Sequence, residues 1–185
     1  MSFTPSTFKS NLSSAGGGAR PSLYKVKINF GSSATNSVSF SGTQTLLVKA
    51  ANLPASNIAP LAVNYAGRAY KWAGFRTYDN WTVTVINDED FAIRNQMTHW
   101  MLWLGGQLDG ERNATFGDPS EDGYWQDGEA YVQQVGAGGD EVGPEYKFSN
   151  LWPTELGEIA VDWSSDALQE YTIGFAYDQW TSSEL

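Results

Sequence analysis

Alternation of apolar and polar residues dominates the chain and predicts strands. In residues 23–30, apolar side chains occupy every second position and mostly polar ones lie between them, which is typical of a strand with one buried face. Residues 81–86 (WTVTVI) give the strongest strand signal, because β-branched and aromatic side chains fit a pleated, half-buried surface. Further strands are predicted within residues 38–51, 61–65, 68–72, 130–135, 146–151, 158–163 and 171–177.

The connections between these strands indicate the fold class. Ala66 and Gly67 separate two alternating runs and predict a two-residue hairpin loop. No strand–helix–strand rhythm is present along the chain. We therefore expect a mainly β fold, an antiparallel β-sandwich or barrel with one flanking α-helix.

That helix is predicted at about residues 88–104. Asn87 or Asp88 can cap it, and residues 88–90 (DED) would place negative charge in the first turn, where the helix dipole favours it. Its apolar stripe is made by Ile93, Met97, Trp100 and Leu104. The last turn is apolar almost all round, so it needs cover on more than one side, either from the chain's own loops or from a second subunit.

The length of the chain fits one domain, and its charge is unevenly distributed between the N-terminal and C-terminal parts. The 185 residues are 41% hydrophobic, a globular composition. Residues 1–108 carry nine basic and four acidic side chains, whereas residues 109–185 carry two and seventeen. This split fits either solvated acidic loops or attraction between opposite faces of two copies. Tight DNA binding is not expected, because it needs a basic surface.

Three segments stand apart from the strands. Residues 1–20 are expected to form an N-terminal arm or flexible entry, residues 107–128 a long acidic loop, and residues 181–185 a C-terminal tail. Residues 1–20 lack the apolar run of a secretory signal, and no stretch approaches the length of a membrane span. We expect no membrane insertion.

Catalytic chemistry finds little support. The chain has no cysteine and one histidine, His99, so thiol nucleophiles and multi-histidine metal sites are excluded. A serine nucleophile would need His99 as its base, yet His99 lies in the predicted helix beside bulky apolar residues, which suits packing or a partner contact. No phosphate-binding, dinucleotide-binding or zinc-protease motif is present. We expect no enzyme, no catalytic residue and no cofactor.

One segment matches a calcium-binding loop. Asp118, Ser120, Asp122 and Glu129 would supply oxygen ligands at the first, third, fifth and twelfth positions, with Gly123 at the sixth. Such a loop needs a helix on each side, whereas the flanking segments here are predicted as loop and strand. The four residues are therefore a weak calcium candidate, and no metal is expected.

The eight tryptophans allow two interpretations. Exposed rings on a β-sandwich can bind sugars, whereas buried rings build cores and subunit interfaces. Five of them lie within or beside predicted strands, which favours core and interface: Trp72, Trp81, Trp152, Trp163 and Trp180.

Several segments, taken in order, resemble one known family. They are residues 19–24 (ARPSLY), residues 79–89 (DNWTVTVINDE) before a helix with Arg94 and Trp100, and residues 151–158 (LWPTELGE) followed by residues 161–163 (VDW) and a last strand ending at Trp180. Residues 53–55 (LPA) and 65–68 (YAGR) fit between them. This combination is similar to the tail tube protein of contractile-tailed bacteriophages, an inner-tube family shared with contractile injection systems.

The resemblance implies a structural virion protein. Members of that family form homohexameric rings, in which each subunit adds strands to a continuous inner β-barrel, and the rings stack into a tube that conducts DNA into the host. Residues 21–180 would form the tail tube domain. The implied location is the virion tail tube, after assembly in the host cytoplasm. The implied partners are further copies of the chain, the tail sheath protein, the baseplate and tail-terminator proteins, a tape measure protein in the lumen, and DNA in transit without sequence-specific binding.

Elementary geometry is consistent with this function. A barrel of about 24 strands spaced ~4.8 Å apart and tilted ~40° has a backbone diameter of roughly 48 Å, which leaves a bore wide enough for a DNA duplex. Contacts between oppositely charged ring faces would weaken as salt rises. The self-assembly interface is expected at Arg20, Pro21, Arg76, Trp100, Met101, Trp103, Trp152, Pro153 and Trp180.

Two other functions remain open from the sequence. The same tube could belong to a contractile injection or secretion system that moves proteins. A carbohydrate-binding β-sandwich module would instead be a monomer with exposed tryptophans. Rings or tubes in electron micrographs would argue against the carbohydrate-binding module.

Overall fold

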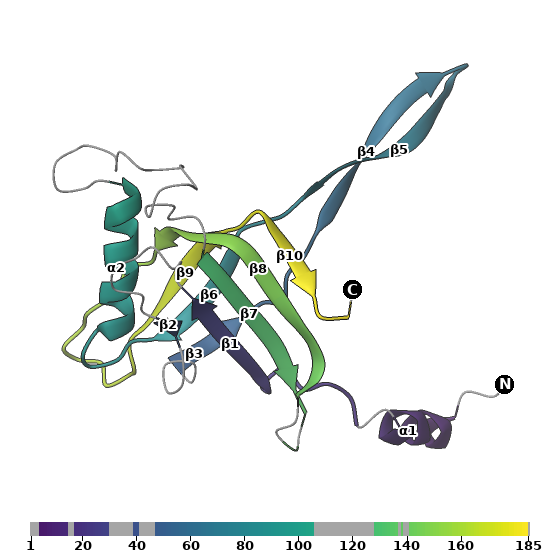
Figure 1. Ribbon diagram of the computed structural model, residues 1–185. Coiled ribbons are helices and arrows are strands. Elements are labelled where there is room, and N and C mark those ends of the chain that lie inside the picture. The colour runs from purple at the N-terminus through teal and green to yellow at the C-terminus, as the bar shows by residue number, and fades with distance from the viewer. Residues whose placement is uncertain are drawn as a thin grey trace.

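The structure, a computed structural model, describes residues 4–14, 17–29, 39–40, 47–105, 128–136, 138 and 141–184 (Figure 1). Most of these residues lie in antiparallel strands, which confirms the expected mainly β class. In chain order the elements are α1 (Pro5–Ser14), β1 (Tyr24–Asn29), β2 (Ser39–Phe40), β3 (Val48–Ala51), β4 (Asn57–Tyr65), β5 (Arg68–Thr77), β6 (Trp81–Ile86), α2 (Ala92–Gly105), β7 (Gly128–Val135), β8 (Glu141–Leu156), β9 (Glu170–Ala176) and β10 (Gln179–Ser182).

One long strand joins the two halves of the main sheet. The strand order is β2-β1-β7-β8-β9-β6-β3, with β10 also paired to β8. The first part of β8 pairs with β7 and β10, and its last part pairs with β9. Asn150 lies between these parts with a left-handed backbone (φ 56°), and its Nδ2 donates to Asp178 Oδ2 at 2.7 Å. The sheet folds over at this point, so its halves face each other.

The core lies between these halves and follows the alternation in the sequence. The first, third and fifth residues of β6 are buried, and so are the second, fourth and sixth residues of β9. The Trp81 ring stacks on Phe148 across the two halves, with centroids 4.6 Å apart. Helix α2 covers one end, where Trp100 packs so tightly over Gly128 that a Cβ there would come within 2.7 Å of its ring.

The start of α2 differs from the prediction. Asp88 does cap the helix, since its Oδ2 accepts the Ala92 N–H at 3.0 Å. The helix begins at Ala92, so the acidic residues 88–90 lie in the preceding turn and the prediction that they occupy the first turn is wrong. Phe91 has a positive φ of 53°, which breaks the helical path between these acids and Ala92.

Two further segments depart from the prediction. Residues 158–163 form no strand, because β9 already pairs with β8 on one side and β6 on the other, so no edge beside it is free. Residues 5–14 within the expected arm form helix α1, where the Thr7 N–H donates to the side chain of Thr4. No side chain of α1 is buried, and its two large apolar residues, Phe8 and Leu12, are both exposed. The predicted loop at 107–128 lies outside the described residues except Gly128, which begins β7.

Tyr171 on β9 makes folding sensitive to alkaline pH. Its side chain is 3% exposed, Arg94 lies over its ring, and its hydroxyl has no hydrogen-bond partner among the described residues. Burial raises the pKa of Tyr171 to about 12; the Arg94 charge opposes this shift and Asp88 adds to it. The unfolded chain loses this proton near pH 10, so the free energy of unfolding falls as pH rises from about 10 to 12, by about 2 to 3 kcal/mol.

Tyr171→Phe should remove that part of the alkaline loss while costing little stability at neutral pH, because no hydrogen bond to a described residue is lost. Urea unfolding at pH 8 and pH 11 measures the difference. Tyr70→Phe, at an exposed tyrosine, is the control. Equal pH slopes for the wild type and the Tyr171→Phe variant would contradict this assignment.

Candidate assembly surfaces

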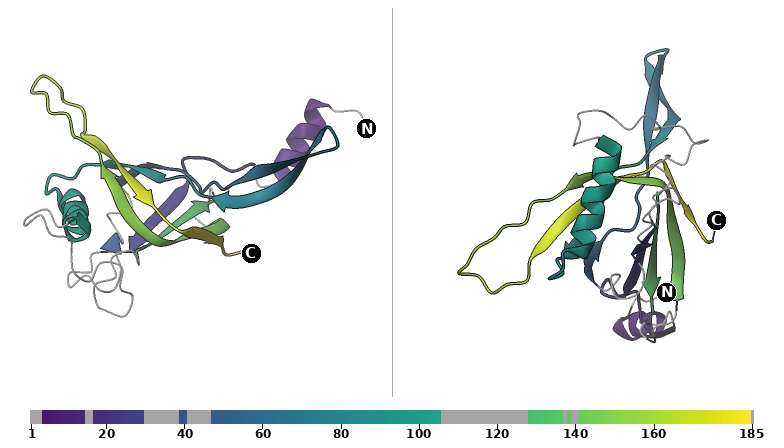
Figure 2. Two further views of the ribbon diagram at one scale, coloured as in Figure 1. Left: turned by 90° about the horizontal axis from the view of Figure 1, so that it is seen from above. Right: turned by 60° about the vertical axis from the view of Figure 1, so that its left-hand side comes forward.

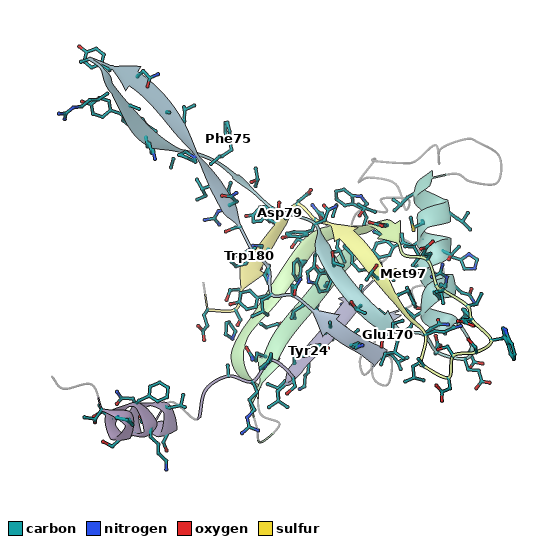
Figure 3. The ribbon with its side chains drawn as sticks, turned by 180° about the vertical axis from the view of Figure 1, so that it is seen from behind. Tyr24, Phe75, Asp79, Met97, Glu170 and Trp180 are labelled. Carbon is teal, nitrogen blue, oxygen red and sulfur yellow. The ribbon has the colours of Figure 1, made fainter. Side chains whose placement is uncertain are left out.

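The first surface is the hairpin of β4 and β5, which forms a separate two-stranded sheet and projects far from the body (Figure 1). Ala66 and Gly67 form its turn with φ values of 51° and 74°, the left-handed pair that a tight two-residue hairpin loop requires. This confirms the predicted turn. Figure 3 shows Phe75 on the projecting hairpin and Asp79 where it joins the body; Trp180 Nε1 donates to the carbonyl of Ala55, in the segment that leads into β4, at 3.3 Å.

Every residue of β4 and β5 is exposed, and the strand register places the cross-strand pairs Leu61–Trp72 and Val63–Tyr70 on one face of the hairpin. Phe75 is 92% exposed and Trp72 67% exposed. An isolated two-stranded hairpin is marginally stable in water, and large exposed apolar patches mark interaction sites. The large exposed apolar side chains are Ile58, Leu61, Val63, Tyr65, Tyr70, Trp72 and Phe75. The hairpin is therefore a candidate interaction surface.

The second surface is the loop of residues 157–169, which projects from the opposite end of the molecule (Figure 2). Its tip carries Trp163, fully exposed, between Val161 and Leu168, which are also exposed. Both ends of the loop are anchored. Arg94 Nη1 donates to the carbonyl of Gly157 at 2.9 Å, and the Asn87 N–H donates to the carbonyl of Gln169 at 2.8 Å.

The third surface is the polar outer face of β1, β7, β8 and β10. The strand register aligns Lys27, Tyr131, Lys147 and Thr181 in one row across these four strands. Lys147 Nζ lies 2.6 Å from Glu129 Oε1, and the Tyr131 hydroxyl donates to Glu129 Oε2 at 2.6 Å. Partial burial opposes ionisation of Glu129, but the hydrogen bonds from Lys147 and Tyr131 outweigh it and lower the pKa of this carboxyl.

Strand β10 gives this polar face an open edge. β10 pairs with β8, and no described strand pairs with its other side. The Ser183 N–H donates to the carbonyl of Glu145 on β8 at 3.0 Å. In an antiparallel pair the direction of the N–H groups alternates, so those of Trp180 and Ser182 point toward the open edge. Such an edge is a template for pairing with another chain.

The residues expected at the self-assembly interface occupy different environments. Arg20, Pro21 and Arg76 are exposed, whereas Trp100 and Pro153 are buried inside the subunit. Met101, Trp152 and Trp180 are partly buried, and the side chain of Trp103 lies outside the described residues. The tryptophans beside strands divide in the same way: Trp81 is buried, and Trp72 and Trp163 are among the most exposed.

The structure describes only some of the residues considered for metal binding and catalysis. Asp118, Ser120 and Asp122 of the calcium candidate lie outside the described residues, and Glu129 is paired with Lys147. Within the described part of the chain, no group of three or more His, Cys, Asp or Glu residues could hold a metal ion. His99 is exposed on α2. Among the same residues, no helix is both long and apolar enough to cross a membrane.

The chain is thus a mainly β protein with large exposed apolar side chains and an open strand edge. The family described as phage tail tube protein matches residues 19–183, and the chain belongs to this family. It is 33% identical to tail tube protein gp19 of Enterobacteria phage T4 over 163 residues, covering 88% of this chain and 90% of that protein. It is 27% identical to the tail tube protein of Serratia phage KSP90 over 181 residues, covering 95% of both chains.

Solved structures of contractile injection systems have the same fold. A chain of the anti-feeding prophage baseplate gives a TM-score of 0.63 at 9% identity, covering 89% of this chain and 95% of that chain. A chain of the anti-feeding prophage tube-terminating cap gives 0.61 at 17% identity, covering 90% and 91%. The resemblance found in the sequence is confirmed: the chain is a structural tail tube protein of a contractile phage virion, and the protein-translocating and carbohydrate-binding alternatives are not favoured.

Proposed function

We propose that this chain closes into hexameric rings and that the rings stack into a tube that conducts DNA into the host. The observation that carries the proposal is the β4–β5 hairpin, where five large apolar side chains share one exposed face. A monomer gains nothing from such a surface, whereas a second copy would bury it and stabilise the hairpin.

Ring closure uses the open edge of β10. Four neighbouring strands per subunit, β1, β7, β8 and β10, would form an inner wall of about 24 strands, and closing the ring would leave no edge open to aggregation. Their polar outer face would line the lumen. The ion pair of Lys147 with Glu129 leaves this lysine less available to phosphate, which favours passage of DNA without tight binding.

The same proposal includes the neighbours of the tube. Tail sheath, baseplate and tail-terminator proteins would contact the outside and the ends of the tube, and a tape measure protein would occupy the lumen before DNA passes. Assembly would take place in the host cytoplasm. The fold shared with chains of a baseplate and a tube-terminating cap supports contacts of this kind.

Electron microscopy and size-exclusion chromatography of the purified protein test ring formation. We expect rings or tubes in the wild type. Ser182→Pro removes an N–H that points out of the β10 edge and leaves the hydrogen bonds to β8 in place, so it should give a folded monomer.

Ser182→Ala keeps the N–H and is the matched control, expected to assemble like the wild type. The melting temperature of each variant verifies folding. A wild type that stays monomeric at every concentration would contradict the proposed function. Normal rings from Ser182→Pro would contradict the proposed role of the β10 edge in ring closure, but not ring formation itself.

A further inference from the structure

The β4–β5 hairpin joins the body through two segments, residues 52–56 before β4 and residues 78–80 after β5, which we call its root. Trp180 on β10 contacts the first segment, because its Nε1 donates to the carbonyl of Ala55 at 3.3 Å. The Trp180 ring also packs edge-on against Tyr146 of β8, with ring centroids 5.6 Å apart. A side chain of β10 therefore holds the entry to the hairpin against the main sheet.

The exit from the hairpin is held by the same part of the chain. The centroid of the Tyr78 ring lies 5.7 Å from that of Tyr177, which comes shortly before β10. Tyr177 is 9% exposed, and its ring packs edge-on against Phe148 in the core with centroids 4.9 Å apart. Residues 177–180 thus contact both sides of the root and connect them to the core.

Strand β10 itself has a strand partner on one side only. It consists of four residues and pairs with β8, while no described strand pairs with its other edge. The main-chain N–H of Trp180 points toward that open edge. A short strand paired on one side opens locally at low cost in free energy, and the bond from Trp180 to the root is lost whenever β10 opens. In the isolated subunit, the hairpin is therefore only loosely fixed at its root.

We infer that Trp180 couples closure of the ring to the direction of the hairpin. This inference rests on the proposed function and adds an order of events to it. When a neighbouring copy pairs with β10, the main-chain N–H of Trp180 binds that copy while its indole N–H binds the carbonyl of Ala55. β10 is then held on both sides, and the root of the hairpin is held with it. The hairpin of an unassembled copy turns about its root, whereas the hairpin of a copy in a ring keeps one direction.

This coupling has a consequence for the order of assembly. A hairpin that turns freely loses conformational entropy when it binds, whereas one already held in its bound direction loses less. The exposed apolar side chains of the hairpin are therefore a weaker binding surface in the free subunit than in a closed ring. Ring closure comes first, and single copies are protected from premature association through their hairpins.

Distances between two spin labels test the coupling. The chain contains no cysteine, so introduced cysteines can be labelled specifically, and Ala62→Cys on the hairpin and Asn95→Cys on α2 are exposed sites for the pair. Labelled copies are diluted with unlabelled ones, and size-exclusion chromatography separates rings from tubes. Double electron–electron resonance then gives the distribution of distances. The distribution for the Ser182→Pro monomer should be broad, and that for wild-type rings should be narrower by at least about twofold.

Trp180→Phe tests the residue that makes the link. Phenylalanine keeps an aromatic ring against Tyr146 and keeps the main-chain N–H, but it has no indole N–H for the carbonyl of Ala55. Rings of this variant should close, and their distance distribution should stay as broad as that of the monomer. Trp152→Phe makes the same chemical change at another partly buried tryptophan, on β8, and should give the narrow wild-type distribution. Thermal unfolding verifies that each variant folds.

Equal widths in the monomer and in wild-type rings, or a narrow distribution in Trp180→Phe rings, would overturn the inference and leave the proposed function intact. A broad distribution in Trp152→Phe rings would also overturn it, since the loss of any indole would then have the same effect. A wild type that forms no rings would overturn the proposed function and the inference together.

Discussion

Trp81→Ala should lower the free energy of unfolding by about 4 kcal/mol, close to the upper range for a core tryptophan. Trp81 is 3% exposed and lies between the two halves of the sheet, stacked on Phe148 and 5.6 Å from the Phe175 ring centroid. Its Nε1 also donates to the carbonyl of Asn52 at 2.8 Å. The substitution removes the ring contacts, leaves a cavity and deprives that carbonyl of its donor. Urea unfolding of the monomer measures the loss.

Trp163→Ala is the matched control for this experiment. It makes the same chemical change at a side chain that is 100% exposed, so the free energy of unfolding of the monomer should stay within about 0.5 kcal/mol of the wild type. Similar losses in the two variants would show that Trp81 is not the centre of the core.

Replacing Trp72 and Phe75 together by serine should abolish tube formation and leave the monomer as stable as before. Both side chains lie on the hairpin, 67% and 92% exposed, so the isolated subunit loses few contacts. If each ring is an anchor in a well-packed contact, its loss weakens binding about 30-fold, and the pair about 1000-fold. Light scattering as a function of protein concentration measures the shift, and electron microscopy identifies the particles.

The conservative variant Trp72→Phe, Phe75→Leu keeps the apolar surface and is the control, expected to assemble within about tenfold of the wild type. Thermal unfolding of the serine variant establishes that its monomer is intact. Tubes from the serine variant at wild-type concentration would show that the hairpin carries no assembly contact.

Local pattern predicted the central elements well. Residues 81–86 form β6 with the predicted bounds, and the turn at Ala66 and Gly67 has the expected geometry, because both signals depend on neighbouring residues alone. The stripe through Ile93 and Met97 faces the core from α2, as its spacing indicates. The left-handed backbone at Phe91, which delays the helix, has no such local signature.

The candidate assembly surfaces were harder to predict. Alternation of apolar and polar residues shows that a strand has an apolar face, but it does not show whether the same chain or another one covers that face. Leu61 and Tyr65 alternate like core residues of a half-buried strand, yet both are exposed. Trp163 lies in a segment with the same alternation, and no neighbouring strand edge is free to receive it. Trp100, predicted at the interface, packs over Gly128 within the subunit. A sequence signal for the hairpin does exist: acids are absent from it.

Strand β8 has a mechanical consequence for the whole subunit. It is bonded to β7, β9 and β10, so neither half of the sheet can separate without breaking hydrogen bonds made by this strand. The two halves therefore unfold together as one cooperative unit. The hairpin is a separate sheet, so it can unfold locally while the main sheet stays folded. The subunit therefore combines a rigid main sheet with a β4–β5 hairpin that can move independently of it.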